Sequence, residues 1–328
     1  MGVFVLFRSY PTIAEELYGI AVYPAIRVGL DYTLGLVPFP VVYLFPLVLL
    51  YLIWRQVRKK MGVTANLKAG LNLLGWLIAG FYLLWGYNYA RPDLSERIDL
   101  AESVSDEQLF QLGQFSTARL NSLRSAGLLD VKSSNDSWEK ELRQAVGREV
   151  SHYGYGLYTT CRVRQMAPAG ILRKLGITGI YFPFTGEGLV EKSHPIPEKI
   201  FVMAHELAHS FGVTDEGEAN LIAYLACTRH HSDLVQYAGH LALWEYLLHT
   251  FKRKELAIGV ALESNLKPLV QSDLARLKAE RQKYQEWVPR LGDFVNDSYL
   301  KVQGVEAGTD AYQTLPEQVI LHKAFVKE

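Results

Sequence analysis

Two long apolar segments in the first ninety residues constrain this chain more than any other feature. The first runs from about Val37 to Trp54 and the second from about Leu71 to Tyr89, and neither contains a charged residue. A helix needs about 20 apolar residues to cross a bilayer, and two such segments so close together are rare in soluble proteins. The sequence therefore predicts two transmembrane helices, with the lipid bilayer as a partner, in preference to two buried helices of a soluble domain.

The connection between these segments predicts their orientation. Residues 55–70 contain no acidic residue and five basic ones, namely Arg55, Arg58, Lys59, Lys60 and Lys68. By the positive-inside rule such a loop stays in the cytoplasm, so both flanks lie outside. We expect a multi-pass protein of the cell inner membrane. Residues 1–36 would form an extracytoplasmic N-terminal segment, residues 37–89 the membrane part, and residues 90–328 an extracytoplasmic domain.

Composition excludes two classes of function. The chain has 34 basic and 34 acidic residues, so it lacks the positive charge that a nucleic-acid binder uses to neutralise phosphates. Its two cysteines, Cys161 and Cys227, are not spaced as Cys-x-x-Cys, which excludes a thiolate zinc finger. We interpret them as free and buried.

Beyond residue 90 the pattern is mostly helical. Apolar residues recur near helical spacing from Asp106 to Leu128, and a further helix is expected from Ser137 to Ser151. The best strand candidate is Thr178 to Phe184, which is bounded by glycines. Helices are then expected from Pro197 to Phe211 and from Glu216 to Thr228, with three more before about residue 295. The sequence predicts a mainly α fold with a small β element.

The segment His205-Glu206-Leu207-Ala208-His209 is a His-Glu-x-x-His motif on one of these helices. Residues four apart share a helix face, so the two imidazoles can bind one Zn²⁺ ion with Glu206 beside them. In zincins the metal lowers the pKa of its bound water, and the glutamate takes the proton as the hydroxide attacks a carbonyl. The apolar flanks indicate a buried helix, where unpaired polar side chains would each cost a few kcal/mol. The motif therefore predicts a zinc centre.

Three acidic residues after Gly212 compete to be the third ligand. Asp215 stands where another zincin subgroup places its ligand, but Asp215 and Glu218 also make a capping box at the start of a helix. Glu216 heads a Glu-x-x-Ala-Asn string similar to the Glu-x-x-Ala/Ser-Asp signature of gluzincins, where the glutamate binds zinc and the last residue holds a ligand histidine. We predict Glu216 as the third ligand, with Asp215 and Glu218 as alternatives. Asn220 is predicted to hydrogen-bond a ligand histidine.

The combination resembles a bacterial family of membrane zinc peptidases catalogued as domain of unknown function 3810. The resemblance rests on the paired apolar segments, residues 179–187, the histidine motif with Gly212, Glu216, residues 218–220 and residues 296–301. That family usually has a basic residue where this chain has Asp215, which argues against Asp215 as a ligand. The resemblance implies a gluzincin-like, zinc-dependent endopeptidase in a helical zincin-like domain.

Two further roles can be proposed from the order of segments. In zincins an edge strand before the active-site helix pairs with the substrate, and Thr178 to Phe184 stands in that place, although a plain core strand is an equal alternative. Glu187, which follows, is interpreted as solvated. Tyr299 is the first candidate for a donor to the transition state, with His230, His231 and Tyr312 as alternatives. We expect hydrolysis of a protein or peptide near the membrane; the alternative is a zinc-binding membrane scaffold or sensor without turnover.

Overall fold

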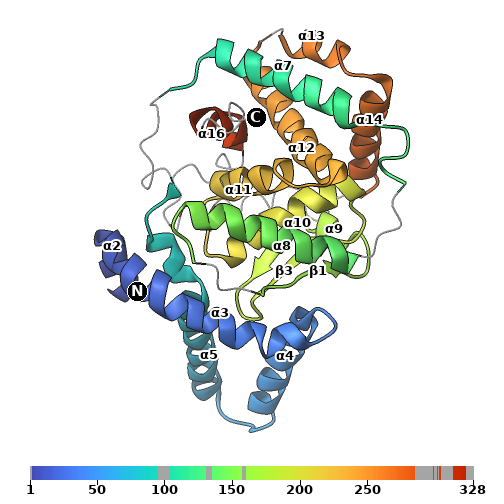
Figure 1. Cartoon of the computed structure of the whole chain (residues 1–328). Helices are drawn as coiled ribbons and strands as arrows, with labels where there is room; N and C mark the ends of the chain where they lie inside the picture. The colour runs from blue at the N-terminus through green and yellow to red at the C-terminus, as the bar shows by residue number, and fades with distance from the viewer. Residues whose placement is uncertain are drawn as a thin grey trace.

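The computed structural model describes residues 2–94, 103–130, 135–156, 160–256, 258–284, 298, 301, 303 and 313–322. It is mainly helical with one small sheet, as the sequence predicts. Figure 1 shows a body of packed helices from which the helices α4 and α5 project together, while α3 crosses between this pair and the body.

The N-terminal part is a series of helical segments, in which residues 11–31 are continuous and α1 is separated from them at Tyr10. It comprises α1 (Gly2–Ser9), α2 (Pro11–Ile13), the π-helix η1 (Ala14–Val22) and α3 (Tyr23–Asp31), followed by the short η2 (Leu34–Leu36). One face of the segment from residue 11 to residue 31 exposes large apolar side chains, among them Ile13, Leu17, Ile20 and Val28. The opposite face is buried against the body through Ala14, Tyr18, Tyr23, Arg27 and Asp31.

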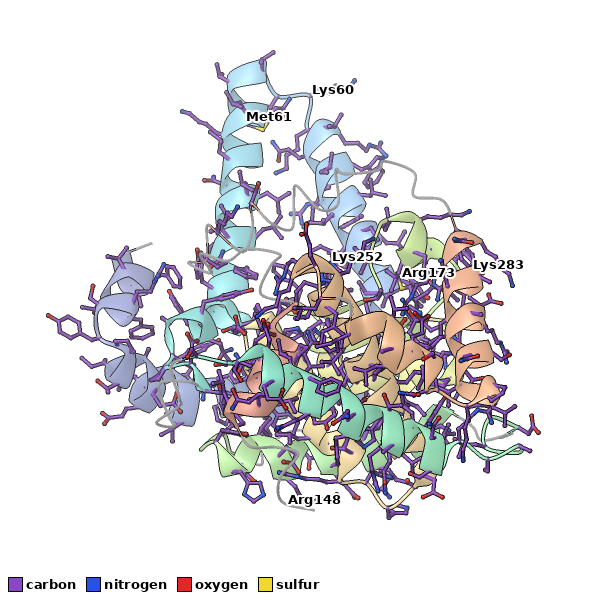
Figure 2. All side chains as sticks on the ribbon, turned by 90° about the horizontal axis from the view of Figure 1, so that it is seen from above. Lys60, Met61, Arg148, Arg173, Lys252 and Lys283 are labelled. Carbon is purple, nitrogen blue, oxygen red and sulfur yellow. The ribbon has the colours of Figure 1, made fainter. Side chains whose placement is uncertain are left out.

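The membrane prediction is supported for one helix. α5 (Val63–Leu84) has 22 residues, a mean hydropathy of 1.5 and only 6% of its apolar window buried, so it is long and apolar enough to cross a bilayer. It begins at Val63 and not at about Leu71, and it ends at Leu84 and not at Tyr89, because the backbone of Trp85 leaves the helical conformation with a φ of −160°. The connection is therefore short, and Lys60 and Met61 lie at the tip of the helix pair (Figure 2).

The first predicted span is not confirmed as one membrane-spanning helix. η3 (Val41–Tyr43) is followed by α4 (Leu44–Val57), which has 14 residues. Pro38 and Pro40 prevent the helix from starting at Val37, since proline lacks the backbone N–H and clashes with the preceding turn. The helical segment Pro11–Leu36 and the segment Val41–Val57 meet at a bend of 82°, and only together do they have the length and composition of a broken span or a re-entrant segment.

A three-stranded sheet lies beside the body. Its order is β1 (Val163–Met166), β3 (Glu187–Glu191) and β2 (Gly179–Phe182), with β1 parallel and β2 antiparallel to β3. The predicted strand is thus confirmed as β2, at an edge of this sheet. β1 is short and polar, and β3 is buried at every position, so neither shows the alternation that predicts a strand.

Glu187 is not solvated, contrary to our interpretation. Its carboxylate is buried on β3 and accepts hydrogen bonds from the backbone N–H groups of Val41, at 2.8 Å, and Val42, at 3.2 Å. Arg164 on β1 lies 3.4 Å from it. A carboxylate at this position satisfies the first N–H groups of the short helix that leads into α4, which explains why it is buried.

The helical body is built around α10 (Ile196–Ser210). This helix packs on the sheet and against α8 (Asn135–His152), α11 (Glu216–Thr228) and α12 (Asp233–Arg253). The remaining described elements are η4 (Gly86–Ala90), α7 (Asp106–Leu123), α9 (Ile171–Lys174), α13 (Ile258–Ser264), α14 (Pro268–Gln282) and α16 (Leu315–Leu321). Most helices were predicted within a few residues. Cys161 and Cys227 are buried and are not joined in a disulfide, as expected.

Candidate metal centre

A tight turn brings the first residue of α11 against the last turns of α10. Gly212 has a φ of +93°, which favours glycine, and a Cβ there would collide with Arg91 and Asn88. Asp215 then caps α11, its Oδ1 accepting a hydrogen bond from the N–H of Glu218 at 2.9 Å. The turn places Glu216 in the first turn of α11, where its carboxylate faces α10.

The two alternative ligands have other roles. Asp215 is the helix cap, and the Glu218 carboxylate accepts a hydrogen bond from the backbone N–H of Leu94 at 2.6 Å. The capping box is therefore only half formed, because the Glu218 side chain turns to another segment. Neither residue belongs to the group that faces the histidines.

Three side-chain atoms converge as the sequence predicts. His205 Nε2 lies 3.0 Å from His209 Nε2 and 3.1 Å from Glu216 Oε2, and His209 Nε2 lies 3.3 Å from that oxygen. All three residues are buried. Two ligands held about 2.0–2.1 Å from a tetrahedral zinc ion are separated by about 3.3–3.4 Å. The three atoms therefore have nearly the spacing of three corners of one coordination tetrahedron.

The outer ring nitrogens fix which atoms carry protons. His209 Nδ1 lies 2.8 Å from the carbonyl oxygen of Val213, which can only accept, so Nδ1 is the donor. His205 Nδ1 likewise faces Asn220 Oδ1 at 2.9 Å. In neutral rings both Nε2 lone pairs then point toward the Glu216 carboxylate. Three electron-rich atoms this close are stable only with a shared proton or a metal cation among them, and the donor set of two imidazoles and a carboxylate would fit Zn²⁺.

In the absence of a metal ion, a proton on His209 supplies the positive charge between the three atoms. Burial by itself would lower the pKa of His209, but the Glu216 carboxylate outweighs it and raises this pKa to about 9. Burial would raise the pKa of Glu216, yet His209 and His205 hold it well below its usual range. Both shifts favour positive charge at the point where the three atoms meet.

Glu206 lies beside this group, against the start of β2. A Cβ on Gly179 would collide with Oε1 of Glu206, so the glycine allows the strand to approach the carboxyl. Among the described residues Oε2 has no hydrogen-bond partner. Burial raises the pKa of Glu206 to about 7, although His205 and His209 oppose the shift. A carboxyl with a pKa near neutrality can both accept and release a proton.

The N-terminal helices form one wall of the centre, which sequence reasoning missed. The Trp85 indole N–H donates to the carbonyl of His209 at 3.1 Å, and the Tyr23 hydroxyl donates to the carbonyl of Ser210 at 2.9 Å. Arg27 donates to the hydroxyl of Tyr181 at 2.7 Å and pairs with Asp31. The one available signal was Arg27 four residues before Asp31 on an otherwise apolar helix.

Tyr299, the predicted donor to the transition state, lies outside the described residues.

Tyr246 on α12 was not predicted; it hydrogen-bonds the side chain of Asn220 and so supports the residue that holds His205. A cavity of about 320 Å³ lies beside Tyr246, and its lining contains neither the two histidines nor Glu206 or Glu216. Its lining includes Thr178, Phe201, Val202, Tyr246, His249 and Arg281.

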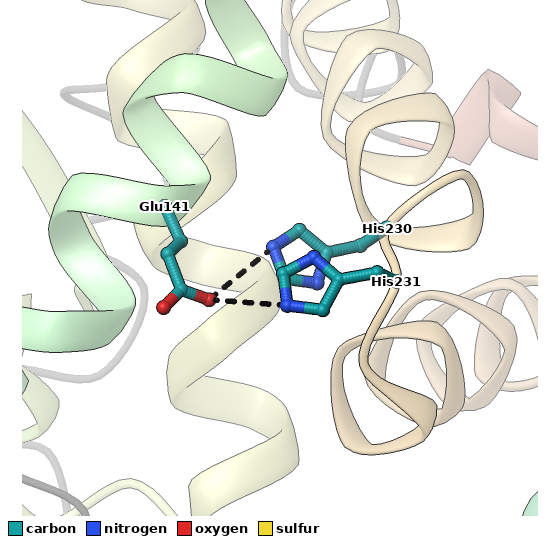
Figure 3. A group of neighbouring side chains, drawn as sticks. All are labelled: Glu141, His230 and His231. Carbon is teal, nitrogen blue, oxygen red and sulfur yellow. Dashed lines mark ion pairs between the residues drawn. The ribbon is translucent and has the colours of Figure 1, made fainter.

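A second group of possible donors lies between α8 and the turn before α12 (Figure 3). His230 Nε2 and His231 Nε2 lie 3.6 and 3.9 Å from Glu141 Oε2. The N–H of Ser232 donates to His230 Nδ1 at 3.1 Å, which places the proton of the neutral ring on Nε2, where a metal ligand needs a lone pair. This group fits a histidine–carboxylate contact better than a metal centre.

The comparisons with known proteins identify a family and no characterised relative. No curated protein and no solved structure matches the chain. A family model described as a protein of unknown function (DUF3810) matches residues 18–320, which is most of the sequence. The paired apolar segments, the histidine motif and Glu216 all lie within this range. The chain therefore belongs to the DUF3810 family.

Proposed function

We propose that the protein is a membrane-anchored, zinc-dependent metallopeptidase of the gluzincin type. The observation that carries the proposal is the convergence of His205, His209 and Glu216, with both outer ring nitrogens held and Glu206 next to them. Structural zinc sites are usually closed by four protein ligands, whereas a set of three leaves a position for water and substrate. A catalytic centre is thus favoured over a structural one.

Each residue of the centre has a separate role in the proposed hydrolysis. A bound zinc ion supplies Lewis-acid chemistry, lowering the pKa of water and polarising a carbonyl. Glu206 lies where it would accept the proton of the attacking water and deliver it to the departing amine. Asn220 orients His205, and the edge strand β2 offers backbone groups to an extended peptide beside Glu206.

A membrane location is supported by the surface of the N-terminal part. α5 and α4 expose large apolar side chains along their length, and the tip between them carries Arg58, Lys59 and Lys60. An exposed apolar surface of this size is unfavourable in water and favourable in lipid. By the positive-inside rule we place the tip in the cytoplasm and the zinc centre outside it.

Glu206→Gln provides the test of function. The purified full-length protein in detergent is incubated with a broad peptide library, and zinc content is measured in parallel. We expect the variant to keep its zinc and to lose cleavage by a factor on the order of a thousand, because the amide cannot take a proton. Glu263→Gln, an exposed position on α13, is the matched control and should cleave like the wild type. Zinc bound by every variant with no cleavage by any would instead favour the scaffold or sensor.

A further inference from the structure

Two surfaces indicate where the bilayer lies relative to the proposed catalytic centre. α5 exposes apolar side chains on its length, as expected for a helix in lipid. The helical segment Pro11–Leu36 is bent by 82° from the segment that contains α4, and its exposed face carries Ile13, Leu17 and Ile20. A helix with one apolar and one packed face is suited to lie in the plane of a membrane surface. The surface of the bilayer therefore lies along this segment.

The turn after β2 also lies at the inferred surface of the bilayer. The ring centroids of Phe182 and Phe184 each lie 5.0 Å from that of Phe45 in the first turn of α4. A Cβ on Gly80, in the last turns of α5, would lie 3.3 Å from Phe184. Aromatic side chains concentrate at membrane interfaces. One end of β2 is thus held between the two helices, at the boundary of the bilayer.

The other end of β2 lies at the proposed catalytic base. Gly179 is in contact distance of Glu206 and Val202 of α10. β2 has four residues, from Gly179 to Phe182, and at about 3.3 Å per residue the strand spans roughly 10 Å. The hydrogen bond from Trp85, the residue after α5, to the carbonyl of His209 independently holds this ligand close to the end of the membrane-spanning candidate. The metal ligands and the bilayer surface are therefore held at a short, constant separation.

We propose that the substrate is a membrane-anchored polypeptide, cut in its extended segment roughly four residues outside the bilayer. This rests on the proposed peptidase function. A strand that pairs with the edge of β2 beside Glu206 continues along β2 to the membrane boundary. A chain that emerges from the bilayer follows this path directly. Ile180, which is 37% exposed on β2, gives the path an apolar side chain between the base and the bilayer.

The test uses the full-length protein in liposomes with a reporter that has one transmembrane helix and an unstructured flank. The flank repeats a single sequence, so that many equivalent bonds are available. We expect cleavage within a window centred roughly four residues from the membrane, and insertion of more residues farther out should not move it. The same flank as a soluble peptide should be cut at least about tenfold more slowly, because it is not delivered to β2.

The outcomes separate this inference from the proposed function. Equal rates for the soluble and anchored flanks, or cuts spread along the anchored flank, would overturn the inference while leaving the peptidase intact. Absence of cleavage of both, with zinc bound, would overturn the peptidase.

A binding measurement tests the inference without turnover. A photoreactive residue is placed at Ile180 in the Glu206→Gln variant, and the same residue at Val260, which is 75% exposed on α13, serves as control. The anchored reporter should crosslink at position 180 and not at position 260, and through the part of its flank nearest the membrane. Crosslinking to a random part of the flank, or equally at both positions, would contradict the inference.

Discussion

The Trp85 indole N–H donates a hydrogen bond to the backbone carbonyl of His209 at 3.1 Å. Trp85 directly follows the membrane-spanning candidate α5, and His209 is a proposed metal ligand. The two rings also meet edge to face, with centroids 6.2 Å apart. The end of α5 is therefore a wall of the candidate zinc centre. A substitution at this end of the helix should change the zinc affinity of the centre.

Trp85→Phe should weaken both stability and zinc binding modestly. Phenylalanine keeps an aromatic ring near Tyr181 but removes the donor to the His209 carbonyl, which retains the N–H of Gly212. The loss of one hydrogen bond should cost about 1 kcal/mol and lower the melting temperature by about 2–4 °C in detergent. Trp76→Phe, at a position 78% exposed on α5, is the control. Equal effects of the two changes would show that the contact to His209 contributes nothing.

His209→Ala should abolish zinc binding, whereas His231→Ala should not. His209 contributes one of three converging ligand atoms, while His231 belongs to the group that fits a carboxylate contact. Metal analysis after dialysis should give close to one zinc per wild-type chain and per His231→Ala chain, and close to none for His209→Ala. The reverse pattern would place the metal at Glu141 and its histidines.

Asn220→Ala should reduce zinc affinity by about 10- to 100-fold, the usual effect of losing a group that orients a ligand histidine. Asn220 accepts the Nδ1 proton of His205 at 2.9 Å and does not face the metal itself. Asn220→Asp keeps an acceptor at that point and should restore affinity to the wild-type level or above. Competition with a chromogenic chelator measures both. If Asp failed to restore what Ala removes, the hydrogen bond would not be the cause.

Glu198 should make the free energy of unfolding depend on pH in the acidic range. Burial would raise its pKa, but His194 and Arg281 outweigh burial and lower this pKa to about 2. A pKa that is depressed in the folded state stabilises the fold above the unfolded value of about 4.5, and this contribution disappears as the pH falls toward 2. Glu198→Gln should therefore cost roughly 3 kcal/mol at neutral pH, and the difference from wild type should shrink below about pH 4.5.

Unfolding by denaturant at a series of pH values from 7 to 3 measures this difference. Glu263→Gln, at an exposed position, controls for the general effect of removing a carboxylate. A difference for Glu198→Gln that stayed constant over the whole range would show that its ion pairs with Arg173 and Arg281 do not stabilise the fold.

The candidate centre could be predicted because its residues are close in sequence. His205 and His209 share a helix face, and Gly212 reverses the chain so that Glu216 and Asn220 return to them within eleven residues of His209. Local spacing and turn chemistry determine such a geometry. The choice of Glu216 over Asp215 and Glu218 also followed from local rules, since Asp215 is the helix cap.

The walls of the centre could not be predicted, because they come from distant segments. Nothing near Trp85 or Tyr23 shows that these residues bond to the end of α10. The burial of Glu187 depends in the same way on the N–H groups of Val41 and Val42. The lengths of α4 and α5 were missed for a different reason, namely that apolar composition marks lipid contact while prolines and polar residues set where a helix begins.

The hydrogen bond between Tyr23 and Ser210 has a consequence for synthesis. Its partners are 187 residues apart, so the N-terminal helix is made long before the body that covers it. Before the body is made, Arg27 can pair only with its neighbour Asp31. Its hydrogen bonds to Tyr181 and Gly186 form after those residues have been synthesised. In the arrangement proposed above, the N-terminal helix therefore reaches the lipid surface first, and the helical body packs onto it later.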